Sequence, residues 1–132
     1  MAKKAGQRAA DEQFFNSKKE EGGVKELNGI LYSVIAEGNS TKSPLPNSVV
    51  TAHYRGTLIN GREFDNSWKR SYPEAFRVSD LIEGFQIALT HMHIGDRWLV
   101  YIPWEKGYGK RNSGPIPALS TLIFEIELIS IS

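Results

Sequence analysis

The sequence of 132 residues has the length of one ordinary domain, and 40% apolar with 23% charged residues is typical of a globular chain that buries a core. The formal net charge of +1 gives no overall field that would favour nucleic acid or an anionic membrane. No stretch approaches the roughly 18 apolar residues that a membrane span requires. The absence of cysteine excludes disulfides, thiolate metal sites and cysteine nucleophiles.

The first 26 residues differ from the rest of the chain. They mix both charge signs with good helix formers, which predicts a helix over residues 5–21 that ends at Gly22-Gly23. Two interpretations remain open. The segment is a solvated, partly frayed extension, or Phe14 and Phe15 dock on the domain or on a second subunit.

From Gly29 onward the pattern changes to that of strands, over residues 29–38, 48–59, 96–103 and 121–131. Asn60-Gly61 predicts a hairpin with a two-residue type I′ turn. The last strand predicts one apolar face, formed by Leu122, Phe124, Ile126 and Leu128.

One helix is predicted inside this set of strands, over residues 79–92. Asp80 followed by Glu83 resembles a capping box at its start. Its apolar stripe consists of Leu81, Ile82, Phe85, Ala88, Leu89 and Met92. A mainly antiparallel sheet packed over a single short helix is an α+β domain, and the sequence shows neither an internal repeat nor a second domain.

The sequence lacks the residue patterns that most types of enzyme catalysis require. His91 and His93 are two residues apart with no nearby third ligand, and His53 is expected to point outward from its strand, so no metal site is expected. No phosphate-binding glycine loop, H-E-x-x-H or G-x-S-x-G motif occurs. What remains is a surplus of aromatic residues at strand ends, in loops and on the helix: Tyr54, Phe64, Phe76, Phe85, Tyr108 and Phe124.

Four segments in order resemble the FKBP-type peptidyl-prolyl cis–trans isomerases: "HYRGTLINGREFDNS", "LIEGFQIAL", "IPWEKGYG" and "GPIPALSTLIFEIELISI". The resemblance covers roughly residues 29–132, and the charged segment before it is similar to bacterial members with an N-terminal helical extension. It implies a twisted antiparallel sheet of five or six strands wrapped around one short helix. Residues 1–26 would form the extension and residues 27–132 the isomerase domain.

The resemblance also implies a proline pocket, residue by residue. Its catalytic positions correspond to Tyr54, Phe64, Asp65, Ile82, Tyr108 and Phe124, and its further substrate-binding positions to Phe76, Leu81, Phe85, Ile116 and Arg70. In this family the backbone N–H at the position of Ile82 binds a ligand carbonyl. The hydroxyl at the position of Tyr108 reaches the ligand, and Arg70 would pair with Asp65.

Two departures from the family pattern concern the shape of this pocket. The floor is usually Trp, whereas this chain has Phe85, which removes an indole ring and its N–H. The flanking loop reads "GPIPAL", so Pro115 and Ala118 change one lip of the pocket. Both departures concern substrate preference and drug affinity more than activity.

The resemblance implies an isomerase that assists protein folding and requires no cofactor or metal. Proline-containing peptides and unfolded proteins would be its substrates, and macrolides such as tacrolimus or rapamycin its inhibitors. A proline-peptide binding or chaperone module with little turnover is the alternative. A homodimer through the extension is left open, and neither nucleic acid nor a membrane is expected as a partner. The expected compartment is the cytoplasm, or the periplasm if a leader precedes this sequence.

Overall fold

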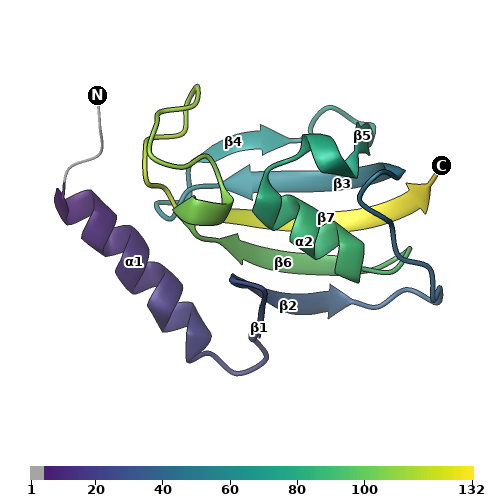
Figure 1. Cartoon of the computed structure of the whole chain (residues 1–132), viewed down its shortest axis with the longest axis horizontal. Helices are drawn as coiled ribbons and strands as arrows, with labels where there is room; N and C mark the ends of the chain where they lie inside the picture. Colours follow the sequence, from purple (N-terminus) through teal and green to yellow (C-terminus); the bar gives the residue numbers. More distant parts are fainter. Residues whose placement is uncertain (1–4) are drawn as a thin grey trace.

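The computed structural model describes residues 5–132, with side chains from residue 9 onward. Two α-helices and seven strands form the ordered elements, with two short 3₁₀ helices between them (Figure 1). In chain order they are α1 (Ala5–Lys19), β1 (Lys25–Leu27), β2 (Ile30–Ala36), β3 (Val49–Thr57), β4 (Glu63–Asn66), β5 (Glu74–Arg77), η1 (Val78–Asp80), α2 (Glu83–His91), β6 (Arg97–Ile102), η2 (Trp104–Lys106) and β7 (Leu122–Ile131).

All seven strands belong to one antiparallel sheet with the order β1-β2-β6-β7-β3-β4, while β5 also pairs with β3. The predicted α+β fold is confirmed, with seven strands where five or six were predicted. The difference arises because β1, β4 and β5 are only three or four residues long. A segment of that length is too short to show a period-two pattern in the sequence.

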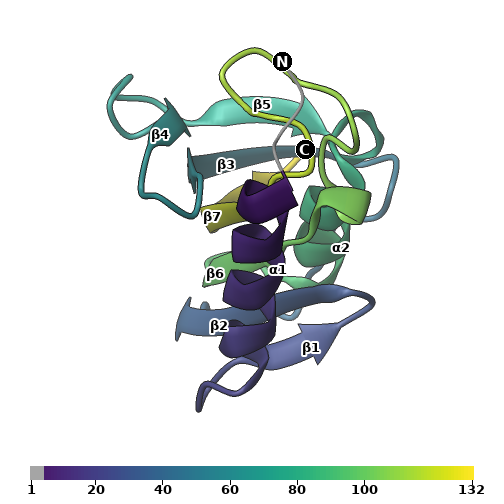
Figure 2. The ribbon, with the colours of Figure 1, turned by 90° about the vertical axis from the view of Figure 1, so that its left-hand side faces the viewer.

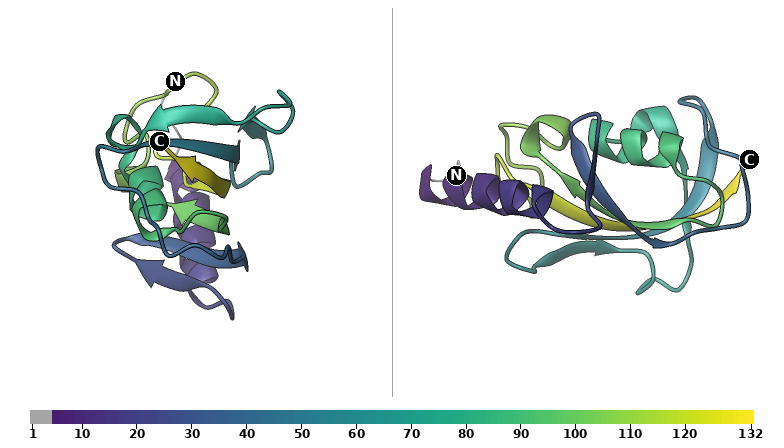
Figure 3. Two further views of the ribbon diagram at one scale, coloured as in Figure 1. Left: turned by 90° about the vertical axis from the view of Figure 1, so that its right-hand side faces the viewer. Right: turned by 90° about the horizontal axis from the view of Figure 1, so that it is seen from below.

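The core lies between α2 and one face of the sheet (Figures 1 and 3). The buried residues of the helix stripe and of the predicted face of β7 meet there, and they comprise Phe85, Ala88, Leu89, Met92, Leu122, Phe124, Ile126 and Leu128. The predicted start of α2 was wrong. Asp80 lies in η1, and the N-cap residue Ile82 makes no side-chain capping bond, because the chain is extended between the two helices.

The turn between β3 and β4 also differs from the prediction. Gly61 has a φ of 87°, but Asn60 does not have a positive φ, so the type I′ assignment was wrong. Leu58 N–H donates to the Arg62 carbonyl, and Gly61 N–H donates to the Leu58 carbonyl, both at 2.9 Å. This is the pattern of a three-residue hairpin loop with glycine in the left-handed position. The Asn60 side chain accepts the Arg62 N–H at 2.9 Å and thereby supports the wider loop.

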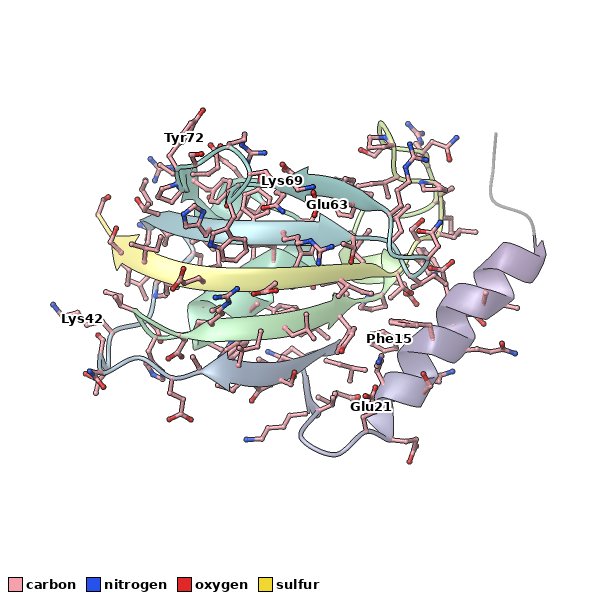
Figure 4. All side chains as sticks on the ribbon, turned by 180° about the vertical axis from the view of Figure 1, so that it is seen from behind. Phe15, Glu21, Lys42, Glu63, Lys69 and Tyr72 are labelled. Carbon is pink, nitrogen blue, oxygen red and sulfur yellow. The ribbon has the colours of Figure 1, made fainter. Side chains whose placement is uncertain are left out.

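Helix α1 docks on its own domain, at the end of the sheet where the loop between β6 and β7 also lies (Figures 1 and 2). Asp11 is 2% exposed, and its carboxylate accepts the Thr121 N–H at 2.9 Å. The Phe14 ring meets Tyr101 edge to face, with the centroids 6.0 Å apart, and Lys18 Nζ lies 5.5 Å from the Tyr101 centroid. Phe15 is half-buried (Figure 4). Of the two interpretations of this segment, docking on the domain is the one observed.

Candidate active site

A pocket of about 380 Å³ opens between the start of α2, strands β3 to β5 and the loop before β7. Every predicted site residue except Arg70 lines this pocket. The described residues that line it are Tyr54, Phe64, Asp65, Phe76, Asp80, Leu81, Ile82, Phe85, Tyr108, Ser113, Gly114, Pro115, Ile116 and Phe124. Its volume lies within the range of small-molecule and peptide sites.

The aromatic rings pack edge to face around the base of the pocket. Phe85 is 4% exposed and lies 5.8 Å from Tyr54 and 5.1 Å from Phe124, measured between ring centroids. Phe64 meets Phe124 at 5.6 Å with an interplanar angle of 87°. Edge-to-face contacts between aromatic rings are favourable, so each ring fixes the orientation of its neighbours. The base of the pocket is therefore formed by aromatic rings that contact one another.

A β-bulge explains how Phe64 and Asp65, adjacent in the chain, both reach this cavity. The register between β3 and β4 shifts after the Gly56–Asp65 pair, because Thr57 pairs with Glu63 and leaves Phe64 without a partner residue. A bulge of this kind breaks the strict alternation of side chains along a strand. A Cβ atom on Gly56 would lie 2.6 Å from Phe64 Cζ and 2.8 Å from Phe124 Cε1. Glycine therefore leaves the space that both rings occupy.

The carboxylate of Asp65 is held by two donors. Arg70 Nη1 lies 2.5 Å from Oδ1, and the Tyr54 hydroxyl donates to Oδ2. Burial alone would raise the pKa of Asp65, but these hydrogen bonds outweigh it and lower the pKa below its ordinary value. Burial, together with the hydrogen bond to Asp65, raises the pKa of Tyr54 to about 12. At neutral pH the site thus contains an ionised aspartate, a neutral tyrosine and a charged arginine, and the predicted Asp65–Arg70 ion pair is confirmed.

Two polar groups of the pocket that the family resemblance singled out make no hydrogen bond within the described residues. They are the N–H of Ile82 and the hydroxyl of Tyr108. Tyr108 is 41% exposed, and partial burial of its hydroxyl raises its pKa. Ile116 is 5% exposed and forms an isolated bridge with Ser113 across the lip of the pocket. Both free groups are therefore available to a bound ligand.

Asp80, Ser113 and Gly114 line the pocket although their positions in the sequence did not predict it. Asp80 was interpreted as a helix cap, and its position just before Leu81 and Ile82 was the signal that could have placed it there. The histidines lie elsewhere. His53 stacks on Trp68 with ring centroids 5.1 Å apart, and residues 5–132 contain no group of three or more potential metal ligands. None of the helices in that range is long and apolar enough to cross a membrane.

The family model of the FKBP-type peptidyl-prolyl cis-trans isomerases matches residues 40–129. The chain belongs to this family. It is 42% identical over 120 residues to the peptidyl-prolyl cis-trans isomerase Mip of Coxiella burnetii, which covers 89% of this chain and 52% of that protein. It is 39% identical over 126 residues to the outer membrane protein MIP of Legionella longbeachae, which covers 94% of this chain and 54% of that protein. The chain thus spans about half the length of these curated FKBP relatives.

A crystal structure of a peptidyl-prolyl cis-trans isomerase from Pseudomonas syringae pv. tomato is similar over its whole length. The TM-score is 0.90 at 34% sequence identity, and the match covers 100% of this chain and 98% of that one. The match therefore includes α1, and the two chains have almost the same length.

Proposed function

We propose that this protein is a peptidyl-prolyl cis–trans isomerase that rotates Xaa-Pro bonds of unfolded or partly folded proteins. The observation that supports this function best is the aromatic pocket whose edge carries the free Ile82 N–H and the free Tyr108 hydroxyl. Rotation about an Xaa-Pro bond makes and breaks no covalent bond, so the reaction needs no nucleophile, general base or cofactor. The membership in the FKBP family supports the same activity.

The chemistry of the reaction fits an apolar cavity. Rotation about the amide passes a barrier of about 18–20 kcal/mol because the twisted C–N bond loses its resonance. The planar amide is the more polar form and water stabilises it, so moving the bond into a dry aromatic pocket removes this advantage. Donors aimed only at the twisted geometry lower the barrier further, and each ~1.4 kcal/mol gives a tenfold increase in rate.

Within this proposal the aromatic rings and the polar groups of the pocket have separate roles. Phe85 forms the floor under the proline ring, while Tyr54, Phe64, Phe76 and Phe124 form the walls. The Ile82 N–H binds a substrate carbonyl, and the Tyr108 hydroxyl binds a second one. Asp65 takes no part in proton transfer. Its hydrogen bonds to Tyr54 and Arg70 hold the Tyr54 ring against the cavity and keep the charge at its edge.

Exchange between cis and trans forms of an Xaa-Pro peptide, measured by NMR, tests the proposal. The wild-type protein should accelerate exchange, and the double variant Phe64→Ala/Tyr108→Phe should lose most of this acceleration. A variant of an exposed residue far from the pocket, Gln13→Ala, serves as the control and should act like the wild type. Line broadening from peptide binding without faster exchange would contradict an enzyme and leave the alternative, a proline-peptide binding module. Phe85 in place of the Trp of related proteins is the observation that favours this second candidate.

We infer that the protein works outside the cytoplasm. The sequence led us to expect the cytoplasm and to keep the periplasm as the alternative. A relative that is 39% identical is named an outer membrane protein, and this name supports the inference. Fractionation of cells that express the natural gene tests it, since the protein should appear with the periplasmic or membrane fraction and not with the cytosol.

A homodimer through residues 1–26 stays a prediction. The face of α1 that carries Asp11 and Phe14 contacts the protein's own domain, so a second subunit would have to use the exposed face with Gln13 and Asn16. Light scattering tests the dimer. A mass of twice 14.8 kDa supports it, and a mass of 14.8 kDa contradicts it.

A further inference from the structure

Two carboxylates line the pocket, and they differ in how their charge is balanced. Asp65 is paired with Arg70 at 2.5 Å and accepts a hydrogen bond from Tyr54. Asp80 is exposed, and its carboxylate makes neither an ion pair nor a hydrogen bond within residues 9–132. Among the described residues, the lining contains no lysine, arginine or histidine. The edge of the pocket at Asp80 therefore carries an uncompensated negative charge.

Two cations near Asp80, one close to it in the sequence and one on the facing loop, are engaged elsewhere. Arg77 Nη1 donates to the Asn47 carbonyl at 2.8 Å. Lys106 Nζ pairs with Glu83 at 2.7 Å, which also satisfies the other carboxylate at the start of α2. Neither Arg77 nor Lys106 is thus positioned to neutralise Asp80 when a ligand occupies the pocket.

Asp80 lies directly beside the backbone that would bind a substrate. Leu81 and Ile82 are both extended, and the Ile82 N–H is free. Two residues of extended chain span roughly 7 Å, so a substrate carbonyl at Ile82 brings the neighbouring substrate side chains within reach of the Asp80 carboxylate. This distance is within the Debye length of about 10 Å at 0.1 M salt, so the charge acts on those side chains.

We propose that Asp80 makes the pocket selective for substrates that carry lysine or arginine within one or two residues of the proline. This inference rests on the proposed isomerase function and names the substrate class of that same pocket. A basic side chain supplies the counter-charge that the protein lacks at this position, whereas an acidic one is repelled. An exposed pair of this kind contributes roughly two- to fivefold in kcat/KM.

Peptides that differ in one residue test the preference. One set carries Lys, Gln or Glu directly before the proline, and a second set carries them directly after it. For each peptide the rate constant kcat/KM is measured by NMR exchange, and the dissociation constant is measured by chemical-shift titration. In at least one set, the wild type should have a higher kcat/KM for the Lys peptide than for the Glu peptide. This Lys-to-Glu ratio of kcat/KM should shrink in 1 M salt. The ratio should approach one in Asp80→Asn and invert in Asp80→Lys.

Glu26→Gln provides the matched control because it removes the same charge from an exposed residue of β1, at the opposite edge of the sheet from β4. It should keep the wild-type ratio. An unchanged ratio in Asp80→Asn would overturn the inference. If all peptides are turned over without a charge preference, this inference alone is overturned. If the dissociation constants depend on peptide charge and on Asp80 but no peptide is turned over, only the isomerase function is overturned. Neither binding nor turnover of any peptide would overturn both.

Discussion

Asp11 and Thr121 are joined by a 2.9 Å hydrogen bond although 110 residues separate them in the sequence. The acceptor lies on α1 and the donor is the backbone N–H just before β7. Thr121 is 3% exposed, so water cannot replace this bond. The bond therefore fixes α1 to the end of the loop that carries Ile116, one of the residues lining the pocket.

Replacement of Asp11 by alanine should destabilise the protein by about 1–3 kcal/mol, because the buried N–H of Thr121 would lose its acceptor. Asp11→Asn keeps an oxygen at this position and should cost less. Urea unfolding measures both free energies, and Gln13→Ala, an exposed neighbour on the same helix, is the control that should leave the midpoint unchanged. Equal midpoints for Asp11→Ala and the wild type would show that α1 is not held by this bond.

Replacement of Gly56 by alanine should damage the pocket more than the fold. The new Cβ would meet Phe64 and Phe124 at less than 3 Å, so both rings have to shift. Overpacking should cost about 1–3 kcal/mol of stability, while a displacement of pocket walls by about 1 Å should lower kcat/KM by up to roughly a hundredfold.

The control for this substitution is Gly22→Ala, where an added Cβ meets nothing within 4 Å. Activity is compared at a temperature well below both unfolding midpoints, so that loss of folded protein does not contribute. A Gly56→Ala variant with full activity would mean that the two rings are not needed in their observed positions.

The stability of the protein should fall on acidification partly through Asp65. Its pKa in the folded state lies below 3.8, so the unfolded chain takes up the proton first as the pH falls. The stability that Asp65 contributes is therefore fully present above the pKa that Asp65 has in the unfolded chain. It is lost as the pH falls through the lower pKa that Asp65 has in the folded protein. The difference in unfolding free energy between wild type and Asp65→Asn should shrink below about pH 4. A difference that stays constant from pH 6 to about pH 3 would contradict the shift.

Phe85→Trp should strengthen binding of a macrolide such as rapamycin by about fivefold. The larger ring would bury a little more apolar ligand surface at the floor, worth roughly 1 kcal/mol. Isothermal titration calorimetry measures the change. Weaker binding would indicate that the indole displaces Tyr54 or Phe76, whose centroids lie 5.8 and 6.1 Å from that of Phe85, instead of filling space.

The elements that follow a regular period could be predicted from the sequence. β7 alternates buried and half-buried residues over most of its length, and α2 buries its predicted stripe, because in both elements one side faces the core. The membership of Tyr54, Phe64 and Phe124 in one pocket was predicted from the family resemblance and not from such a pattern. The geometry brings them together, while their catalytic roles stay predictions.

Other features depend on contacts that a local pattern does not contain. The bulge at Phe64 exists only relative to its partner strand β3, so the sequence of β4 alone does not predict it. Asp80 followed by Glu83 matches a capping box, but the extended backbone of Leu81 and Ile82 separates the two residues. Leu81 and Ile82 line the pocket instead of forming the first turn of the helix.

The pairing of β3 with β7 has a consequence for the synthesis of this chain. β7 lies in the sheet between β6 and β3, so two strands made earlier lack a neighbour until residues 122–131 have left the ribosome. Such long-range pairing makes folding slow, and until then the apolar faces of β3 and β6 stay exposed to other nascent chains. A protein proposed to assist the folding of others thus needs protection of its own during translation.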